Sequence, residues 1–212
     1  MKIVAARTNS GSGDLIAAPR LALCLDFANT LAGRGSAVPL EALHDFDDLI
    51  GWCLAAGFLP EEEAARCRSR ARENPVRAKS VFANAIALRE AIYRIFGRLA
   101  VGAEAENEDL NRLNRALTEA PVRGAVARGC SGFGWRIDPD REAAAELLAP
   151  VVWSAGDLLA GKHLGRVRLC ANQKCLWLFL DDSLGGARRW CSMQACGNRA
   201  KTQRHYQRSK GE

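Results

Sequence analysis

The spacing of apolar residues predicts a chain that is mainly helical over its first three quarters. The longest helical stripe follows Pro75, where apolar side chains recur every three or four positions over about five turns. We therefore expect this helix to form the spine of the core. Its apolar positions are Val81, Ala85, Leu88, Ile92, Ile95 and Leu99.

Further helices are indicated before and after this stripe. Gly57 and Pro60 end one of them, and the glutamates at 61–63, followed by arginines, suit the dipole of the next. The predicted helices cover residues 40–58, 61–72, 106–120 and 141–159, the last of them capped by residues 138–140.

Residues 121–137 place Val126, Phe133 and Trp135 among several glycines, a pattern typical of a β-hairpin. We therefore expect a fold of the α+β class that is mainly α. A helix-rich N-terminal domain with small hairpin or sheet elements would cover residues 1–160. A linker at 161–165 would begin a C-terminal module over residues 161–212.

Charge divides the chain at the same boundary. The formal net charge of the 212 residues is +6, but residues 161–212 hold eleven Lys or Arg and three acidic residues, which gives +8 there and −2 elsewhere. A basic tail on a slightly acidic body suggests that a polyanion meets the C-terminal quarter.

The longest stretch without charged residues, 49–60, is far shorter than a membrane span of about 20 residues. Because an apolar secretory segment is also absent, we expect no membrane partner and a cytoplasmic location.

Four of the eight cysteines form two pairs of identical spacing, Cys170-x4-Cys175 and Cys191-x4-Cys196. Four thiolates on short turns supply the tetrahedral sulfur ligands that zinc prefers. Since four thiolates leave no open coordination position, we expect one structural zinc ion per chain and not a catalytic one. Two disulfides or four unrelated buried thiols are the alternatives, which a reducing compartment and the repeated spacing disfavour. The other cysteines, expected to be small buried hydrophobes, are Cys24, Cys53, Cys67 and Cys130.

The segment between the two pairs predicts a hairpin, with a strand over 176–180, a turn over 181–186 and a return over 187–190. Ser192 is placed to cap a helix that runs to Arg208 without proline. A cysteine knuckle, a hairpin, a second pair and a helix together describe a treble-clef-like zinc finger.

At the second pair the sequence is RRWCSMQACGNRAKTQRHYQR, which resembles the CGNR zinc-finger family, named after the tetrapeptide at 196–199. At 21–31 it is LALCLDFANTL, which resembles the start of the ABATE domain. That domain precedes this finger in bacterial proteins described as stress-induced transcription regulators. The resemblance implies a stress-related bacterial DNA-binding regulator whose four cysteines bind zinc. Its N-terminal domain would serve as a sensor or oligomerisation domain.

The C-terminal helix itself favours a nucleic-acid partner. Between residues 188 and 210 there are seven basic residues and no acidic one, and Lys201, Arg204 and Arg208 fall along one helical face. Lys and Arg contact phosphates, while amide side chains can reach base edges. The candidate DNA contacts are Arg188, Arg189, Asn198, Arg199, Lys201, Arg204 and Arg208.

Other interpretations of this helix stay open. Part of its charge can compensate the negative charge of a zinc–thiolate centre, or the tail can be solvated and without a partner. The finger can instead bind a protein partner as an adaptor, or release zinc on oxidation as a redox sensor. Trp177 and Trp190 could also stack on single-stranded bases, so DNA is preferred mainly on the resemblance.

Asp26 and Asn29 lie beside an apolar segment and are followed by the glycine-rich stretch 33–35. They are candidates for a pocket that binds a small-molecule effector; alternatively, Asp26 caps a turn and Asn29 satisfies backbone groups.

A regulator that binds two half-sites favours a homodimer, although the sequence locates no interface. Residues 1–160 hold no Gly-rich phosphate loop, nucleophile elbow or paired metal ligands, so we expect that the protein is not an enzyme.

Overall fold

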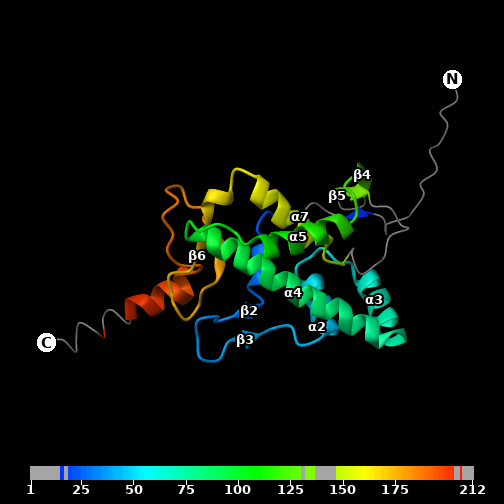
Figure 1. Cartoon of the computed structure of the whole chain (residues 1–212), viewed down its shortest axis with the longest axis horizontal. Helices are drawn as coiled ribbons and strands as arrows, with labels where there is room; N and C mark the ends of the chain where they lie inside the picture. The colour runs from blue at the N-terminus through cyan, green and yellow to red at the C-terminus, as the bar shows by residue number, and fades with distance from the viewer. Residues whose placement is uncertain (1–14, 17–18, 130–131, 137–146, 203–205, 207–212) are drawn as a thin grey trace, which may run out of the picture.

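The fold is given by a computed structural model, which describes residues 15–16, 19–129, 132–136, 147–202 and 206. The body, up to residue 160, contains the helices α1 (Leu23–Ala28), α2 (Phe46–Ala55), α3 (Glu61–Glu73), α4 (Pro75–Ala100), α5 (Asn107–Glu119) and α7 (Ala149–Ala160). Its strands are β1 (Leu15–Ile16), β2 (Leu31–Ala32), β3 (Leu40–Glu41), β4 (Ala125–Gly129) and β5 (Gly132–Arg136). The finger, from residue 161 on, contains the 3-10 turn η1 (Leu164–Arg166), the strands β6 (Val167–Leu169) and β7 (Leu178–Leu180), and the π-helical turn η2 (Met193–Gly197). The predicted α+β class, mainly α with small antiparallel sheets, is confirmed (Figure 1).

Helix α4 crosses the molecule and carries the core, as the apolar stripe predicts (Figure 1). The Asn74 side chain begins the helix by accepting the N–H of Arg77, and Pro75 occupies the first turn, where its missing N–H is not needed. The buried residues of the helix are Ala85, Leu88, Arg89, Ala91, Ile92, Ile95 and Phe96. Helices α1, α2, α3 and α5 and the strands β6 and β7 all pack against α4, so it is the spine of the whole molecule.

The helix predicted over 40–58 is shorter in the structure. Strand β3 takes the start of this stretch and pairs antiparallel with β2, and α2 begins only at Phe46. The Asp45 side chain accepts the N–H groups of Asp47 and Asp48 and so caps the helix. The prediction was wrong before Phe46 because apolar spacing shows neither this cap nor the strand partner.

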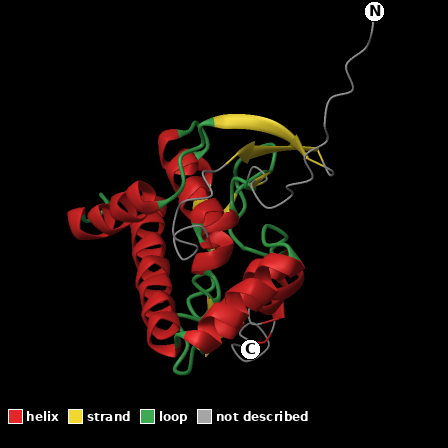
Figure 2. Cartoon of the chain, turned by 90° about the vertical axis from the view of Figure 1, so that its right-hand side faces the viewer, coloured by secondary structure: helices red, strands yellow, loops and turns green. Residues whose placement is uncertain are grey.

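Helices α3 and α5 and the β4–β5 hairpin lie where the sequence predicts them. The hairpin is antiparallel, with Val126 opposite Trp135, and β1 pairs with the other edge of β5. The last predicted helix of the body is present as α7; its start over 141–146 and its cap at 138–140 lie outside the described residues. Helices make up most of the ribbon in Figure 2. None of the described helices is long and apolar enough to span a bilayer.

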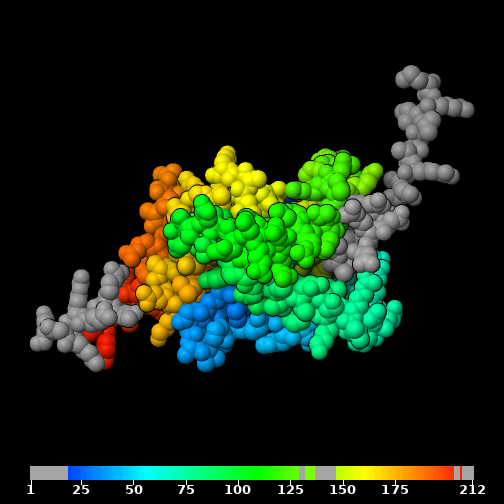
Figure 3. All heavy atoms as spheres, in the orientation of Figure 1, coloured from blue at the N-terminus to red at the C-terminus, as the bar shows by residue number. Residues whose placement is uncertain are grey.

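The body and the finger share one hydrophobic core. Val167 of β6 and Leu178 of β7 are each 1% exposed and belong to the same buried cluster as Phe27 of α1 and Ile92 of α4. Burial of one such side chain stabilises the fold by about 1.5–3 kcal/mol. The finger lies at one end of the molecule and α3 at the other (Figure 3), yet the hairpin of the finger is packed into the body. The domain boundary between residues 160 and 161 stays a prediction.

Candidate metal centre

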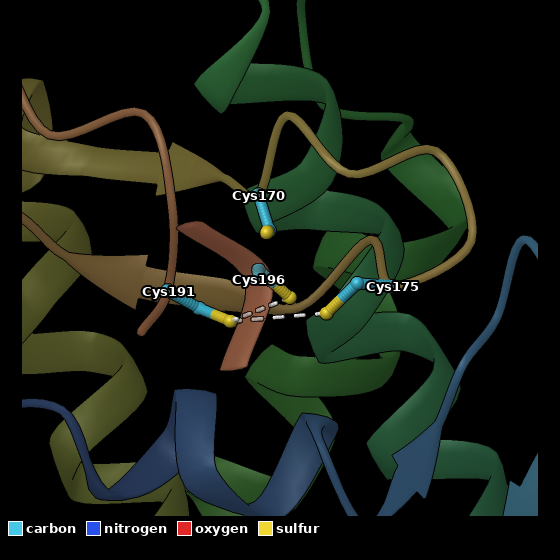
Figure 4. A group of neighbouring side chains, drawn as sticks. All are labelled: Cys170, Cys175, Cys191 and Cys196. Carbon is cyan, nitrogen blue, oxygen red and sulfur yellow. Dashed lines mark hydrogen bonds between the residues drawn. The ribbon is translucent and has the colours of Figure 1, made fainter. Parts of the chain in front are cut away.

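Four sulfur atoms converge beside the hairpin of the finger (Figure 4). The Sγ atoms of Cys170, Cys175, Cys191 and Cys196 all lie within 4.8 Å of one another. The Sγ atoms of Cys175 and Cys191 are 3.8 Å apart, as are those of Cys191 and Cys196. In a tetrahedral site with zinc–sulfur bonds of about 2.3 Å, neighbouring sulfurs lie about 3.8 Å apart. The four predicted ligands therefore fit one zinc ion.

The first pair of cysteines lies on the turn between β6 and β7, residues 170–177, which we call the first knuckle. The two strands pair antiparallel on either side of it, with Leu169 opposite Leu178. The N–H of Cys170 donates to the carbonyl of Trp177 at 2.8 Å and extends this ladder by one bond. The hairpin thus fixes the start of the first knuckle.

The observed hairpin of β6 and β7 differs from the hairpin that the sequence predicts between the two cysteine pairs. The strand predicted over 176–180 is present as β7, but its partner is β6 and not the stretch 187–190, which forms no strand. Instead, the N–H of Ala171 donates to the carbonyl of Arg189 at 2.9 Å and holds the returning segment against the knuckle. The sequence hid β6 because a strand of three residues with Arg168 at its centre gives almost no periodic signal.

Asp181 organises the loop between β7 and the second pair. Its side chain is fully buried, and its carboxylate accepts the hydroxyl and the N–H of Ser183 at 2.6 and 3.0 Å and the N–H of Arg188 at 2.9 Å. These hydrogen bonds, above all the one from the Ser183 hydroxyl, lower the pKa of Asp181 and keep it ionised at neutral pH. The loop that leads to Cys191 is therefore fixed by a buried carboxylate.

Ser192 caps the helical turn that carries Cys196, as the sequence predicts. Its Oγ accepts the N–H of Ala195 at 3.3 Å, and its carbonyl accepts the N–H groups of Cys196 and Gly197, both at 3.0 Å. A Cβ on Gly197 would lie 2.7 Å from the sulfur of Met193. The Met193 side chain thus lies over Gly197, and Cys196 is directed at the other sulfurs (Figure 4).

Burial and hydrogen bonds set the acidity of the thiols. Burial raises the pKa of Cys175 to about 11 and also raises the pKa of Cys191. Burial acts on Cys196 in the same direction, but a hydrogen bond from Asn172 Nδ2 to its sulfur at 3.4 Å and bonds with the other thiols outweigh it and lower its pKa. Zinc must therefore displace protons from Cys175 and Cys191 at neutral pH.

The predicted DNA contacts fall into two groups, of which the first lies on the loop before Cys191. The Arg188 guanidinium donates to Asp182 Oδ1 at 2.7 Å and to the carbonyl of Cys191 at 2.9 Å. Arg189 is exposed, and its guanidinium lies 5.6 Å from the ring centroid of Trp190. Arg188 thus helps to hold the loop that leads to Cys191, and compensation of the zinc–thiolate charge stays an open alternative.

The second group lies on the helix that continues from η2. Residues 198–202 are α-helical, and Asn198, Arg199 and Lys201 are exposed there. Within the described part of the chain, no ion pair involves Arg199 or Lys201. The two candidates that lie outside the described residues are Arg204 and Arg208.

Asp26 and Asn29 make separate contacts. Asp26 forms an ion pair with Arg20 at 3.0 Å. The Asn29 amide binds the backbone of Leu178, with Nδ2 donating to the carbonyl at 2.8 Å and Oδ1 accepting the N–H at 3.0 Å. Asn29 therefore satisfies backbone groups, which is the alternative that the sequence left open, and the effector pocket stays a prediction.

A network of ion pairs in the body was not found from the sequence. Arg89 is 2% exposed and donates to both carboxylate oxygens of Glu41, at 2.6 and 2.8 Å, and through Nε to Glu90 at 2.9 Å. Glu90 also accepts two hydrogen bonds from Arg34, at 2.7 and 3.0 Å. Most of these partners are about fifty residues apart and leave no local pattern. The sequence feature that could have indicated this network is Arg89, a charged residue inside the apolar stripe of α4.

Two short cysteine pairs that close on one tetrahedral site, with a helix that begins at the second pair, define a zinc finger with one structural zinc ion. Comparison with family models agrees, since residues 166–209 match the CGNR zinc finger. Residues 21–162 match the ABATE family, described as "Putative stress-induced transcription regulator". This match covers more than half of the chain, so the protein belongs to the ABATE family and carries a C-terminal CGNR zinc finger. Among curated proteins, no relative matches the chain.

Proposed function

We propose that the protein is a bacterial transcription regulator that binds double-stranded DNA through the basic helix of its zinc finger. The observation that carries the proposal is the position of Arg199 and Lys201. Both are exposed on the helical stretch 198–202, which begins next to the zinc ligand Cys196. The helix thus has a fixed origin and carries positive charge that no acidic residue of the described chain neutralises.

Zinc and the Ser192 cap give this helix its rigidity. Apolar residues are scarce in the segment after Cys196, so its own side chains supply little of a core to hold it. The cap and the metal ligand together fix the first turn instead. A surface that is ordered before binding loses less conformational freedom on contact with a partner, which favours binding.

The distribution of charge supports DNA as the partner. Residues 161–212 carry a net charge of +8, while the rest of the chain carries −2. Arg204 and Arg208 continue the basic face of Lys201 at helical spacing along the sequence. Neutralising phosphates with several Lys and Arg releases counterions and supplies most of the sequence-independent affinity for DNA.

The place of the helix in the molecule leaves it accessible. It begins at the end of the finger and projects away from the helices of the body (Figure 1), and the space-filling view shows the finger at one extremity (Figure 3). A duplex can therefore approach the finger without meeting α3 or the β4–β5 hairpin. Regulation of transcription would place the protein in the bacterial cytoplasm.

The salt dependence of DNA affinity tests this proposal. For the wild-type chain we expect a log–log slope of about −3 to −5, which corresponds to about four or five neutralised phosphates. The double variant Arg199→Ala/Lys201→Ala should bind more weakly, with a slope smaller in magnitude by about 1 to 2. Fluorescence anisotropy of a labelled duplex at several salt concentrations measures both quantities, and zinc content is determined for each preparation.

A matched control removes two positive charges elsewhere. Arg72 and Lys79 are exposed at the end of α3 and the start of α4, at the opposite end of the molecule from the finger. The variant Arg72→Ala/Lys79→Ala should keep the wild-type slope. Equal losses in the two variants would show that only net charge matters, and binding that does not respond to salt would favour a protein partner.

A further inference from the structure

Two parts of the body contact the first knuckle: Tyr93 of helix α4 and the loop 33–36. The hydroxyl of Tyr93 on this helix donates to the carbonyl of Leu176 at 3.0 Å. Leu176 directly follows the zinc ligand Cys175 and has a φ of 55°, a left-handed conformation that residues with a Cβ rarely adopt. Tyr93 therefore supports a strained residue next to a metal ligand.

The loop 33–36 is the second part of the body that contacts the knuckle. A Cβ on Gly35 would overlap the carbonyl oxygen of Gln173, so this approach is open only to glycine. A Cβ on Gly33 would face the carbonyl oxygen of Lys174 at 3.6 Å, and its φ of 65° also suits glycine. Both contacts involve the backbone of the knuckle, which cannot swing aside as a flexible side chain can. The loop thus fits the shape of the knuckle.

Arg34 joins the two parts. Its guanidinium lies 3.8 Å from the ring centroid of Tyr93 and donates to the carbonyl of Ala28 at 3.0 Å. It also donates to both carboxylate oxygens of Glu90, and its side chain is 10% exposed. Because Glu90 is bonded to the buried Arg89 as well, the loop and Tyr93 are anchored in the ion-pair network of the body.

We propose that the loop 33–36 and Tyr93, together called the socket, position the first knuckle for zinc, so that the body raises the zinc affinity of the finger. Two of the four ligands, Cys170 and Cys175, lie on this knuckle, and half of the ligand set therefore depends on its shape. A site whose ligands are already in place loses less conformational freedom when the metal binds. Tyr93 and Gly35 are positioning residues, since neither is a ligand.

The first test removes a single oxygen atom from the socket. In the full chain, Tyr93→Phe should weaken zinc binding about three- to tenfold, as expected for the loss of one hydrogen bond. Competition with a chromophoric chelator measures the dissociation constant. The Co²⁺-loaded variant should keep the absorption bands of a tetrahedral four-thiolate site, which shows that the same ligands hold the metal more weakly.

Tyr206 offers the matched control, because it is exposed and Tyr206→Phe makes the same chemical change. This variant should bind zinc as the wild type does. A zinc affinity of Tyr93→Phe within twofold of the wild type would overturn the proposal, even if the variant unfolds at a lower temperature. The hydroxyl would then serve stability alone.

The second test pushes the loop off the knuckle. Gly35→Ala should release zinc to an excess of chelator at least about tenfold faster than the wild type, in the range seen when residues that support metal ligands are changed. Gly185→Ala is the control within the finger, because an added Cβ there meets no atom within 4 Å. Equal release rates from the wild type and a folded Gly35→Ala chain, or equal acceleration in both variants, would overturn the proposal. If circular dichroism shows that Gly35→Ala does not fold, Tyr93→Phe alone decides.

Discussion

The side-chain amide of Asn29 pairs with the backbone of Leu178 in the way that a neighbouring strand would, with one hydrogen bond donated and one accepted. Asn29 ends helix α1 of the body, and Leu178 begins strand β7 of the finger, 149 residues later in the chain. A specific polar contact therefore joins the body and the finger in addition to the shared core.

Replacing Asn29 by alanine should weaken this junction. The N–H and carbonyl of the buried Leu178 would lose their partners, and unpaired buried groups of this kind destabilise a protein by about 1–3 kcal/mol. We expect the free energy of unfolding of the zinc-loaded chain in urea to fall by about that amount. Asn111→Ala, at an exposed position of α5, should change it by less than about 0.5 kcal/mol. Similar values for the two variants would contradict the role assigned to Asn29.

Replacing Arg89 by methionine should destabilise the body strongly. The variant keeps most of the side-chain volume but leaves the carboxylates of Glu41 and Glu90 without their shared partner. Breaking a buried ion pair destabilises by about 3–5 kcal/mol, and because both carboxylates are more than a quarter exposed we expect about 2–4 kcal/mol here. The control Arg66→Met removes an exposed arginine of α3 and should lower the free energy of unfolding by less than about 1 kcal/mol. A small effect at Arg89, measured by urea unfolding, would show that the network adds no stability.

Zinc affinity should rise steeply with pH. In the metal-free chain burial raises the pKa of Cys175 to about 11 and raises that of Cys191, so both thiols hold a proton at neutral pH that zinc must displace. With at least two protons released per zinc ion, the dissociation constant should fall by at least about a hundredfold for each unit by which the pH rises. Competition titrations between pH 6.5 and 8 measure this slope, and a pH indicator counts the protons released.

The buried thiol of Cys67 provides the control for this titration, because it lies outside the four-cysteine cluster. Cys67→Ala should leave the slope and the number of released protons unchanged. A zinc affinity that is constant over this pH range would mean that the ligand thiols are already ionised without the metal.

Local patterns predicted the parts of the structure that local forces decide. The stripe after Pro75 indicated α4 because apolar residues at helical spacing leave one face to bury. The equal spacing of the cysteines indicated the ligand set, since a short turn brings two sulfurs to one metal ion. Ser192 was found as a cap because its hydroxyl serves N–H groups within the next turn.

Contacts between distant segments were beyond this reasoning. The bond between Tyr93 and Leu176 spans 83 residues, and an amphipathic pattern shows which face is buried but not what covers it. The sequence does not show why residue 35 is a glycine, because its close contact with Gln173 forms only in the folded chain. The partner of β7 was assigned wrongly for the same reason: strand pairing is decided by the core that both strands join, and Val167 of β6 is part of that core.

In our proposal, zinc turns the basic C-terminal segment into a surface that binds DNA. The most direct measurement is the affinity of one full-length preparation for a labelled duplex in three states: loaded with zinc, stripped by a chelator, and resupplied with one equivalent of zinc. We predict that stripping weakens binding at least about tenfold, because the first turn of the helix loses its fixed origin, and that one equivalent restores it. The same affinity in all three states would contradict the proposal.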